Sequence, residues 1–284
     1  MILNRRDLLM GALALPALEA KISSTFGGVP LGAQTYSFRD RDVDGCIAAM
    51  KEIGMGVAEL FSGHVEPKVE RGPTGREQIR KWRLTVSDAE LKQIATKFKA
   101  ANIEIYAYNY SFRDDFTDEE IERGFFIAKA LGAKCITASS NVSTAKRIAP
   151  FAAKHKMLVG MHNHSRIVPN EFATPENFRD AMSAGKYIGV NLDIGHFWAA
   201  NFDPVKFLEE THKSMTTVHL KDRKKNQGPN LAFGEGDTPI KETLHLMRAK
   251  KWKIPAVIEY EYKGADTVAE VKKCFEYCKR ILES

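Results

Sequence analysis

Residues 103–139 read IEIYAYNYSFRDDFTDEEIERGFFIAKALGAKCITAS and contain one complete strand–helix–strand repeat. Both ends of this segment, IEIYAY and KCITAS, are short, apolar runs of the kind that forms buried strands. Between them, apolar residues recur at helical spacing, namely Ile121, Phe125, Ile127, Ala128 and Leu131. Apolar strands that alternate with helices indicate a parallel sheet covered by helices on its faces.

The same unit recurs along the rest of the chain. Strand candidates begin near Leu31, Val57, Ile103, Lys134, Met157, Ile188, Met215 and Pro255. Eight such units in about 250 residues predict a (β/α)8 TIM barrel, formed as a single domain by residues 21–284. An open, doubly wound sheet is the alternative. That fold usually has a glycine-rich turn after its first strand, and residues 35–38, TYSF, do not form one.

The longest connection between these units runs from residue 62 to about residue 83. A loop of this length inside a compact domain is usually functional. We therefore expect a lid over the site, with a surface insertion of no function as the alternative.

Residues 1–20 read MILNRRDLLMGALALPALEA. Arg5 and Arg6 precede an uncharged apolar run from Leu8 to Leu18, and a small residue, Ala20, follows it. This pattern predicts a twin-arginine-type signal and export to the periplasm, with an amphipathic first helix as the alternative. The apolar run is shorter than the roughly 20 residues that a membrane span needs, so we expect no membrane association of the mature protein.

The composition is that of a globular protein, with 44% hydrophobic and 27% charged residues and a net charge of +6 over 284 residues. A mean hydropathy of −0.31 excludes a multi-span membrane protein. The basic residues are scattered, so we expect no nucleic-acid partner. Cys46 and Cys135 are expected to be small buried residues, and Cys274 and Cys278 to share one helix face without a disulfide.

Polar residues gather at the carboxyl ends of the expected strands, where a barrel places its active site. In chain order they are Gln34; Glu59; Tyr108 and Asn109; Ser139 and Asn141; His162 and His164; Asp193 and His196; His219, Lys221 and Asp222; and Glu259 and Glu261. Strands five to eight each end in a histidine or a carboxylate, which apolar strands tolerate only when these groups are paired or bind a metal. The pattern therefore predicts a divalent metal site at the barrel mouth.

Four segments give the chain a resemblance to a known family. They are VNLDIGH (190–196), VHLKD (218–222), FGEGD (233–237) and IEYE (258–261). Over nearly the whole of residues 21–284 the sequence resembles the sugar phosphate isomerase/epimerase group of the xylose-isomerase-like TIM barrels. The resemblance implies one divalent metal, commonly manganese, held by Asp193, His219 and Glu259, with cobalt, iron or zinc as alternatives. It also implies that His196 contacts a small carbohydrate substrate.

The departure from this family lies on strand five, where the epimerases have a glutamate and this chain reads MHNH (161–164). His162 takes the place of the glutamate and is expected to be the fourth metal ligand, with His164 beside it near the substrate; the two could be exchanged. An imidazole bound to a metal is a poor proton acceptor. Glu259 is therefore the expected single base, which would remove a proton next to a carbonyl to give a metal-stabilised enediolate.

A single base suits aldose–ketose isomerisation or β-elimination from a keto-sugar better than epimerisation. His196, Lys221 or His164 could supply the second proton. Of the basic run Lys221, Arg223, Lys224 and Lys225, we expect only Lys221 to reach the site and the others to remain in water.

Four residues are expected to bind substrate, namely Glu59, Asn109, His164 and Trp198. Glu59 either contacts substrate hydroxyls or forms a structural ion pair, and Trp198 either stacks on a sugar ring or packs in the core. Two other functions remain open. One is a metal-dependent phosphodiesterase like the barrel endonucleases that cut DNA at abasic sites, and the other is a sugar-binding protein without catalysis. The phosphodiesterases need a cluster of metals and more histidines after strand seven than residues 222–231 contain.

Overall fold

A computed structural model describes residues 22–284, and the expected export segment, residues 1–20, lies outside the described residues. Eight parallel strands form a closed barrel, because β2 pairs with β3 at one seam and with β11 at the other. The strands are β2 (Val29–Gln34), β3 (Val57–Phe61), β4 (Glu104–Asn109), β5 (Cys135–Ala138), β6 (Val159–His162), β7 (Ile188–Asp193), β8 (Met215–Leu220) and β11 (Ala256–Ile258). The predicted TIM barrel is thereby confirmed.

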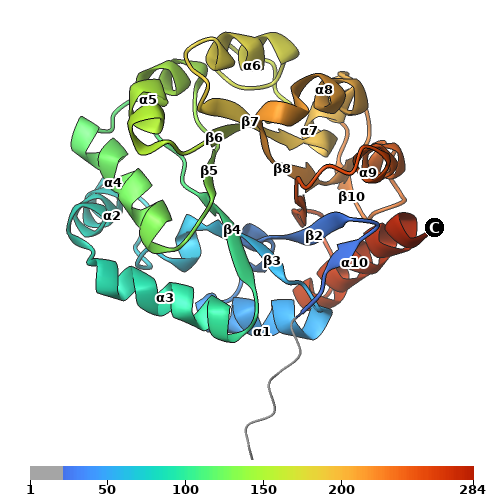
Figure 1. The fold of residues 1–284 in the computed structure, drawn as a ribbon, viewed down its shortest axis with the longest axis horizontal. Helices are drawn as coiled ribbons and strands as arrows, with labels where there is room; N and C mark the ends of the chain where they lie inside the picture. Colours follow the sequence, from blue (N-terminus) through green and yellow to red (C-terminus); the bar gives the residue numbers. More distant parts are fainter. Residues whose placement is uncertain (1–21) are drawn as a thin grey trace, which may run out of the picture.

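Helices surround the barrel, as the view down its axis shows (Figure 1). They are α1 (Val43–Ile53), α2 (Pro73–Thr85), α3 (Asp88–Ala100), α4 (Asp118–Ala130), α5 (Val142–His155), α6 (Pro175–Met182), α8 (Pro204–Thr211), α9 (Ile240–Ala249) and α10 (Thr267–Glu283). Helix α4 shows how the sequence specifies them. Thr117 and Glu120 form a reciprocal capping box at its start, and the apolar side chains expected to face the core, including Ile121 and Phe125, are buried.

The expectation of a long loop from residue 62 to residue 83 is wrong, because helix α2 fills the second half of that segment. Pro73 begins the helix, which packs against α4, and Arg80 forms an ion pair with Glu120 at 2.8 Å. Helix α2 buries only Gly75 completely, so its sequence has almost no apolar period from which a helix could be recognised.

The remaining elements extend the carboxyl-terminal side of the barrel or cover its amino-terminal side. Strand β1 (Thr25–Phe26) pairs antiparallel with β2, and β9 (Asp222–Arg223) with β10 (Asn230–Leu231). The short helix α7 (Ile194–Ala199) follows β7 directly.

All four cysteines are buried and free, as expected. Among residues 22–284 no helix is both long and apolar enough to span a membrane.

Candidate metal and substrate site

The four predicted metal ligands converge at the carboxyl end of the barrel. His162 ends β6, Asp193 ends β7, His219 lies in β8 and Glu259 directly follows β11. One ligand atom from each residue can be chosen so that all four atoms lie within 4.8 Å of one another. Parallel register places these residues side by side, with Asp193 opposite His219 and His219 opposite Val257 of β11. We call these four residues the ligand cluster.

The carboxylate of Asp193 is oriented by the helix that follows it. Its Oδ1 accepts a hydrogen bond from the backbone N–H of His196 at 2.7 Å and so caps the start of α7. Its Oδ2 is buried and accepts no hydrogen bond. A buried carboxylate oxygen without a hydrogen bond is costly unless a cation lies beside it, and here the Lys221 ammonium lies 3.1 Å away. The ligand cluster fits a divalent cation in its mixture of imidazoles and carboxylates, and Asp193 Oδ2 already has a cationic neighbour in place of a hydrogen-bond donor.

The two imidazoles of the ligand cluster have opposite pKa shifts. Burial, with help from His219, lowers the pKa of His162 to about 4, so this imidazole is neutral at pH 7. Burial also disfavours the charged form of His219, but the carboxylates of Glu59 and Glu259 on its two sides outweigh it and raise its pKa to about 10. Glu59 Oε1 lies 2.9 Å from His219 Nε2, and Glu259 Oε2 lies 3.1 Å from Nδ1.

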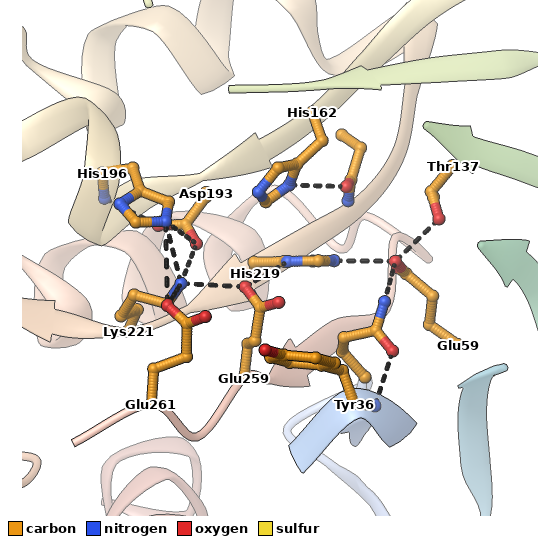
Figure 2. A network of polar contacts seen from close by, with 12 residues as sticks. Tyr36, Glu59, Thr137, His162, Asp193, His196, His219, Lys221, Glu259 and Glu261 are labelled. Atoms are coloured by element: carbon orange, nitrogen blue, oxygen red, sulfur yellow. Dashed lines mark hydrogen bonds and ion pairs between the residues drawn. The ribbon is translucent and has the colours of Figure 1, made fainter. Parts of the chain in front are cut away.

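Lys221 lies among three carboxylates and is 2% exposed. Its Nζ is 2.7 Å from Glu261 Oε2, 2.9 Å from Glu259 Oε2 and 3.1 Å from Asp193 Oδ2 (Figure 2). Burial disfavours the charged form of Lys221, but these carboxylates raise its pKa above the ordinary range, so it remains an ammonium. Burial would raise the pKa of Asp193, whereas His196 and Lys221 lower it to about 2.

His196 lies between two basic side chains. Its Nδ1 is 2.7 Å from Arg223 Nη1, and its Nε2 is 3.0 Å from Lys221 Nζ. A guanidinium and an ammonium can both only donate, so a neutral His196 offers one acceptor nitrogen to two donors. Burial lowers the pKa of His196 well below its usual value, which keeps the imidazole neutral.

A cavity of about 240 Å³ opens onto the ligand cluster and holds most of the other predicted residues. His164 and Asn109 line it together with His162, His196, His219 and Glu259. The ring of His164 is exposed and lies 5.3 Å from that of His162, centroid to centroid. His162, at the end of β6, belongs to the ligand cluster, and His164 lies beside it at the cavity wall.

Two residues expected to bind substrate do not reach this cavity. Glu59 is fully buried and is engaged with His219, so the structure shows the structural ion pair in place of a substrate contact. Burial would raise the pKa of Glu59, but His219 and two threonine hydroxyls lower it. Trp198 does not line the cavity either, because its Nε1 donates to Asp237 at 2.7 Å and its ring stacks under the ammonium of Lys225.

Sequence reasoning assigned no site role to three residues that the fold places here. Tyr36 and Glu261 line the cavity. Arg223, expected in water, is 9% exposed and contacts His196, because the β9–β10 hairpin folds back and Gly228 O accepts from its guanidinium at 2.6 Å. Glu261 was named among the polar residues at the strand ends but given no role, whereas nothing local distinguishes Arg223 from the exposed Lys224 and Lys225.

The segment FGEGD (233–237) folds around the carboxylate of Asp222. Asp222 accepts hydrogen bonds from the backbone N–H groups of Gly234 (2.8 Å), Gly236 (3.0 Å) and Thr238 (3.2 Å). Gly234 has φ +96°, a conformation that favours glycine. The segment FGEGD thus folds as a tight turn held by a carboxylate, and its Glu235 is exposed.

Comparison with known proteins agrees with this architecture. The chain is similar in structure to a sugar phosphate isomerase/epimerase from Parabacteroides distasonis, with 18% identity and a TM-score of 0.63 over 90% of this chain and 97% of that one. It is also similar to 3-keto-D-glucoside 4-epimerase from E. coli, with 14% identity and a TM-score of 0.65 over 89% and 99%. A D-tagatose 3-epimerase-like protein gives 15% identity and a TM-score of 0.65 over 89% and 98%.

At these identities the likeness shows a shared fold. No curated protein matches the sequence significantly. The sequence profile described as xylose isomerase-like TIM barrel, however, matches residues 47–281, which is most of the chain. The chain belongs to the xylose isomerase-like TIM barrel family.

Proposed function

We propose that the protein is a divalent-metal-dependent enzyme that removes a proton next to a carbonyl of a sugar or keto-sugar. The observation that supports this most is the ligand cluster, four convergent metal-ligating side chains at the end of the barrel where this fold has its active sites. Structural neighbours named as sugar epimerases support the substrate class.

His162, Asp193, His219 and Glu259 would hold the metal. Manganese is our first choice, and cobalt, iron and zinc suit the same mixture of imidazole and carboxylate ligands. When bound, the cation would polarise a carbonyl oxygen and stabilise the negative charge that develops on it.

Glu259 is our candidate for the base. Of the two carboxylates in the ligand cluster, Glu259 lines the cavity, whereas Asp193 is fully buried and engaged in capping α7. Burial would raise the pKa of Glu259, but Lys221 and His219 lower it well below its usual range. Glu259 is therefore ionised at neutral pH, the form that can accept a proton.

His196 is our candidate for the group that donates to the substrate. Its Nε2 faces the side of the cavity where Lys221 and Glu261 lie (Figure 2). Lys221 is held by three carboxylates, so its role is to balance their charge and orient Glu259. Asn109 and His164 complete the set as substrate contacts at the cavity wall.

This arrangement favours a reaction with one base. Simple inversion at carbon requires a second proton-transfer group on the opposite face of the substrate, and the position of the family glutamate is occupied here by His162, which is neutral. Isomerisation or β-elimination can proceed with Glu259 as base and His196 as acid. A phosphodiesterase with several metals is disfavoured, because residues 22–284 contain a single group of metal-ligating side chains.

Elemental analysis of the purified protein, followed by a screen of keto-sugars and their glycosides in D₂O, tests the proposal. We expect one divalent ion per chain and incorporation of deuterium next to the carbonyl of at least one compound. Several ions per chain would support the phosphodiesterase instead. Metal binding without exchange on any keto-sugar would support a sugar-binding protein.

A further inference from the structure

A chain of buried hydrogen bonds runs beneath the ligand cluster and centres on Glu59. Its Oε1 accepts from Gln34 Nε2 at 2.9 Å, Thr137 Oγ1 at 2.7 Å and His219 Nε2 at 2.9 Å (Figure 2). Its Oε2 accepts from Thr217 Oγ1 at 2.6 Å. Glu59 itself has no exposed surface.

The surroundings of Glu59 fix the direction of these hydrogen bonds. Gln34 turns its Nε2 toward Glu59 because its Oε1 already accepts from the backbone N–H of Tyr36. Thr137 Oγ1 accepts from Asn109 Nδ2 at 3.2 Å, so the hydroxyl hydrogen is free to point to Glu59. All four partners direct a hydrogen at Glu59, so the carboxylate accepts from each of them.

His219 is the first imidazole that this arrangement orients. Because Glu59 can only accept, Nε2 of His219 carries a proton. The other nitrogen, Nδ1, lies on the side of the ligand cluster, 3.1 Å from Glu259 Oε2. Nδ1 also faces a carboxylate and so carries a proton in this structure. A metal would take the place of that proton, because Glu59 holds the other proton on Nε2.

His162 is oriented by the same carboxylate through two intermediates. The hydroxyl of Thr217 has one hydrogen, and it is donated to Glu59, so Oγ1 must accept from Asn191 Nδ2 at 2.6 Å. Asn191 Nδ2 also faces the Thr217 carbonyl oxygen at 3.3 Å, which fixes the same amide orientation. Asn191 Oδ1 therefore faces His162 Nδ1, at 3.0 Å.

An amide oxygen only accepts, so His162 carries its proton on Nδ1 and its lone pair on Nε2. The two imidazoles thus present opposite nitrogens to the ligand cluster. We infer that Glu59 is a positioning residue that sets the proton position of both metal-ligating histidines, His219 directly and His162 through Thr217 and Asn191. This inference rests on the metal site of the proposed function.

The substitution Glu59→Gln tests the inference because it exchanges one accepting oxygen for a donating NH₂ at nearly the same size. If that NH₂ faces Thr217, the Thr217 hydroxyl must reverse and donate to Asn191. Asn191 Nδ2 then faces a hydroxyl hydrogen, and turning the amide to accept that hydrogen would place Asn191 Oδ1 against the Thr217 carbonyl oxygen. Either arrangement disturbs the contact that keeps the His162 proton on Nδ1. If the NH₂ faces the other way, it meets three donors in place of an acceptor.

Two further variants separate the branches of the network. Thr217→Val removes the relay to His162 and leaves the contact between Glu59 and His219. Thr137→Val is the matched control, because it removes a hydroxyl of the same kind that donates to Glu59 but lies on neither path to a histidine.

The readouts are Zn²⁺ affinity by calorimetry and the ring-proton positions by long-range ¹H–¹⁵N correlation spectra of ¹⁵N-histidine-labelled protein, with and without Zn²⁺. The His162 signals are assigned with a His162→Gln sample. In the wild type we expect protons on Nδ1 of His162 and, with Zn²⁺ bound, on Nε2 of His219. We expect Glu59→Gln to weaken Zn²⁺ binding about 10- to 100-fold and Thr217→Val about 10-fold, with Thr137→Val near the wild type.

A wild-type His162 proton on Nε2, or wild-type Zn²⁺ affinity in folded Glu59→Gln and Thr217→Val, would overturn the inference. If Glu59→Gln fails to fold, the Zn²⁺ affinity of Thr217→Val and the wild-type spectrum test the inference. If the wild type binds no divalent ion, the proposed function fails, and the His162 proton position in the metal-free protein still decides the inference.

Discussion

The ammonium of Lys221 lies 3.1 Å from Asp193 Oδ2, the one oxygen of that carboxylate that accepts no hydrogen bond. The same ammonium contacts Glu259, a second member of the ligand cluster. Lys221 therefore occupies the carboxylate side that a divalent cation would use. The ammonium and the cation are expected to compete for these oxygens.

Lys221→Met should destabilise the metal-free protein and increase its affinity for Mn²⁺. Removing one partner of a buried ion pair costs about 3–5 kcal/mol, because the remaining charges stay buried without a counterion. For a domain of this size we expect the melting temperature in EDTA to fall by roughly 10 °C. Calorimetric melting with EDTA and with Mn²⁺ measures both effects.

The control for this prediction is Lys224→Met, which removes the same charge from an exposed position three residues along the chain. It should leave the melting temperature and the Mn²⁺ affinity unchanged. Weaker Mn²⁺ binding in Lys221→Met than in the wild type would contradict the competition between ammonium and cation.

Gly195 in α7 allows that helix to approach β8 closely. A Cβ at this position would lie 2.5 Å from the Lys221 carbonyl oxygen and 2.8 Å from Lys221 Cβ. Helix propensity alone favours alanine over glycine by about 1 kcal/mol, but overpacking against a fixed backbone typically costs about 1–3 kcal/mol. We expect Gly195→Ala to lower the free energy of unfolding by up to about 2 kcal/mol in net terms and to weaken metal binding.

Denaturant unfolding and metal titration measure the two effects. The control is Gly185→Ala, where the added methyl group would meet only Ala149 Cβ at an ordinary 3.9 Å. Its stability should stay within about 0.5 kcal/mol of the wild type. Equal stability of Gly195→Ala and Gly185→Ala would show that α7 can move away from β8 at no cost.

The barrel could be predicted from sequence because its strands are apolar throughout and its helices have one apolar face. The segment from 103 to 139 shows both patterns, and its Ile121 and Phe125 are buried as the helical spacing requires. A metal site at the barrel mouth could be predicted for a related reason, and the family resemblance then singled out the four members of the ligand cluster. Histidines and carboxylates at the ends of buried strands need a physical explanation, and the closed barrel brings those ends together.

Position at a strand end does not predict whether a side chain faces the cavity or the interior of the barrel. Glu59 pairs in register with Gln34 on β2, but its carboxylate is enclosed by donors from β2, β5 and β8. Those donors come from strands distant in sequence, so no local pattern distinguishes this enclosed carboxylate from one that faces the cavity. Arg223 was missed for the same reason, since its burial depends on the β9–β10 hairpin folding back over it.

The predicted export segment is testable apart from the barrel. A twin-arginine signal depends on its arginine pair, so Arg5→Lys with Arg6→Lys should retain the protein in the cytoplasm. Cell fractionation with a carboxyl-terminal tag measures this, and Arg39→Lys, an exposed arginine beyond the segment, serves as the control. Equal periplasmic recovery of the double variant and the wild type would refute a twin-arginine signal.

Glu259→Gln should abolish proton exchange while leaving the fold intact. The amide keeps the size of the side chain and an oxygen that faces the ligand cluster, but it cannot accept a proton at neutral pH. General base catalysis typically contributes 10²–10⁴-fold, so we expect deuterium incorporation into a reactive keto-sugar to fall by at least about 100-fold. Metal affinity should fall as well, so exchange rates are compared at saturating Mn²⁺.

Glu261→Gln is the matched control for this prediction. Glu261 lines the same cavity and contacts the same Lys221 at 2.7 Å, but it lies outside the ligand cluster. Loss of charge near Lys221 is therefore common to both variants, and only Glu259→Gln removes the proposed base. Exchange that is lost in Glu261→Gln and retained in Glu259→Gln would transfer the role of base to Glu261, two residues further along the same loop.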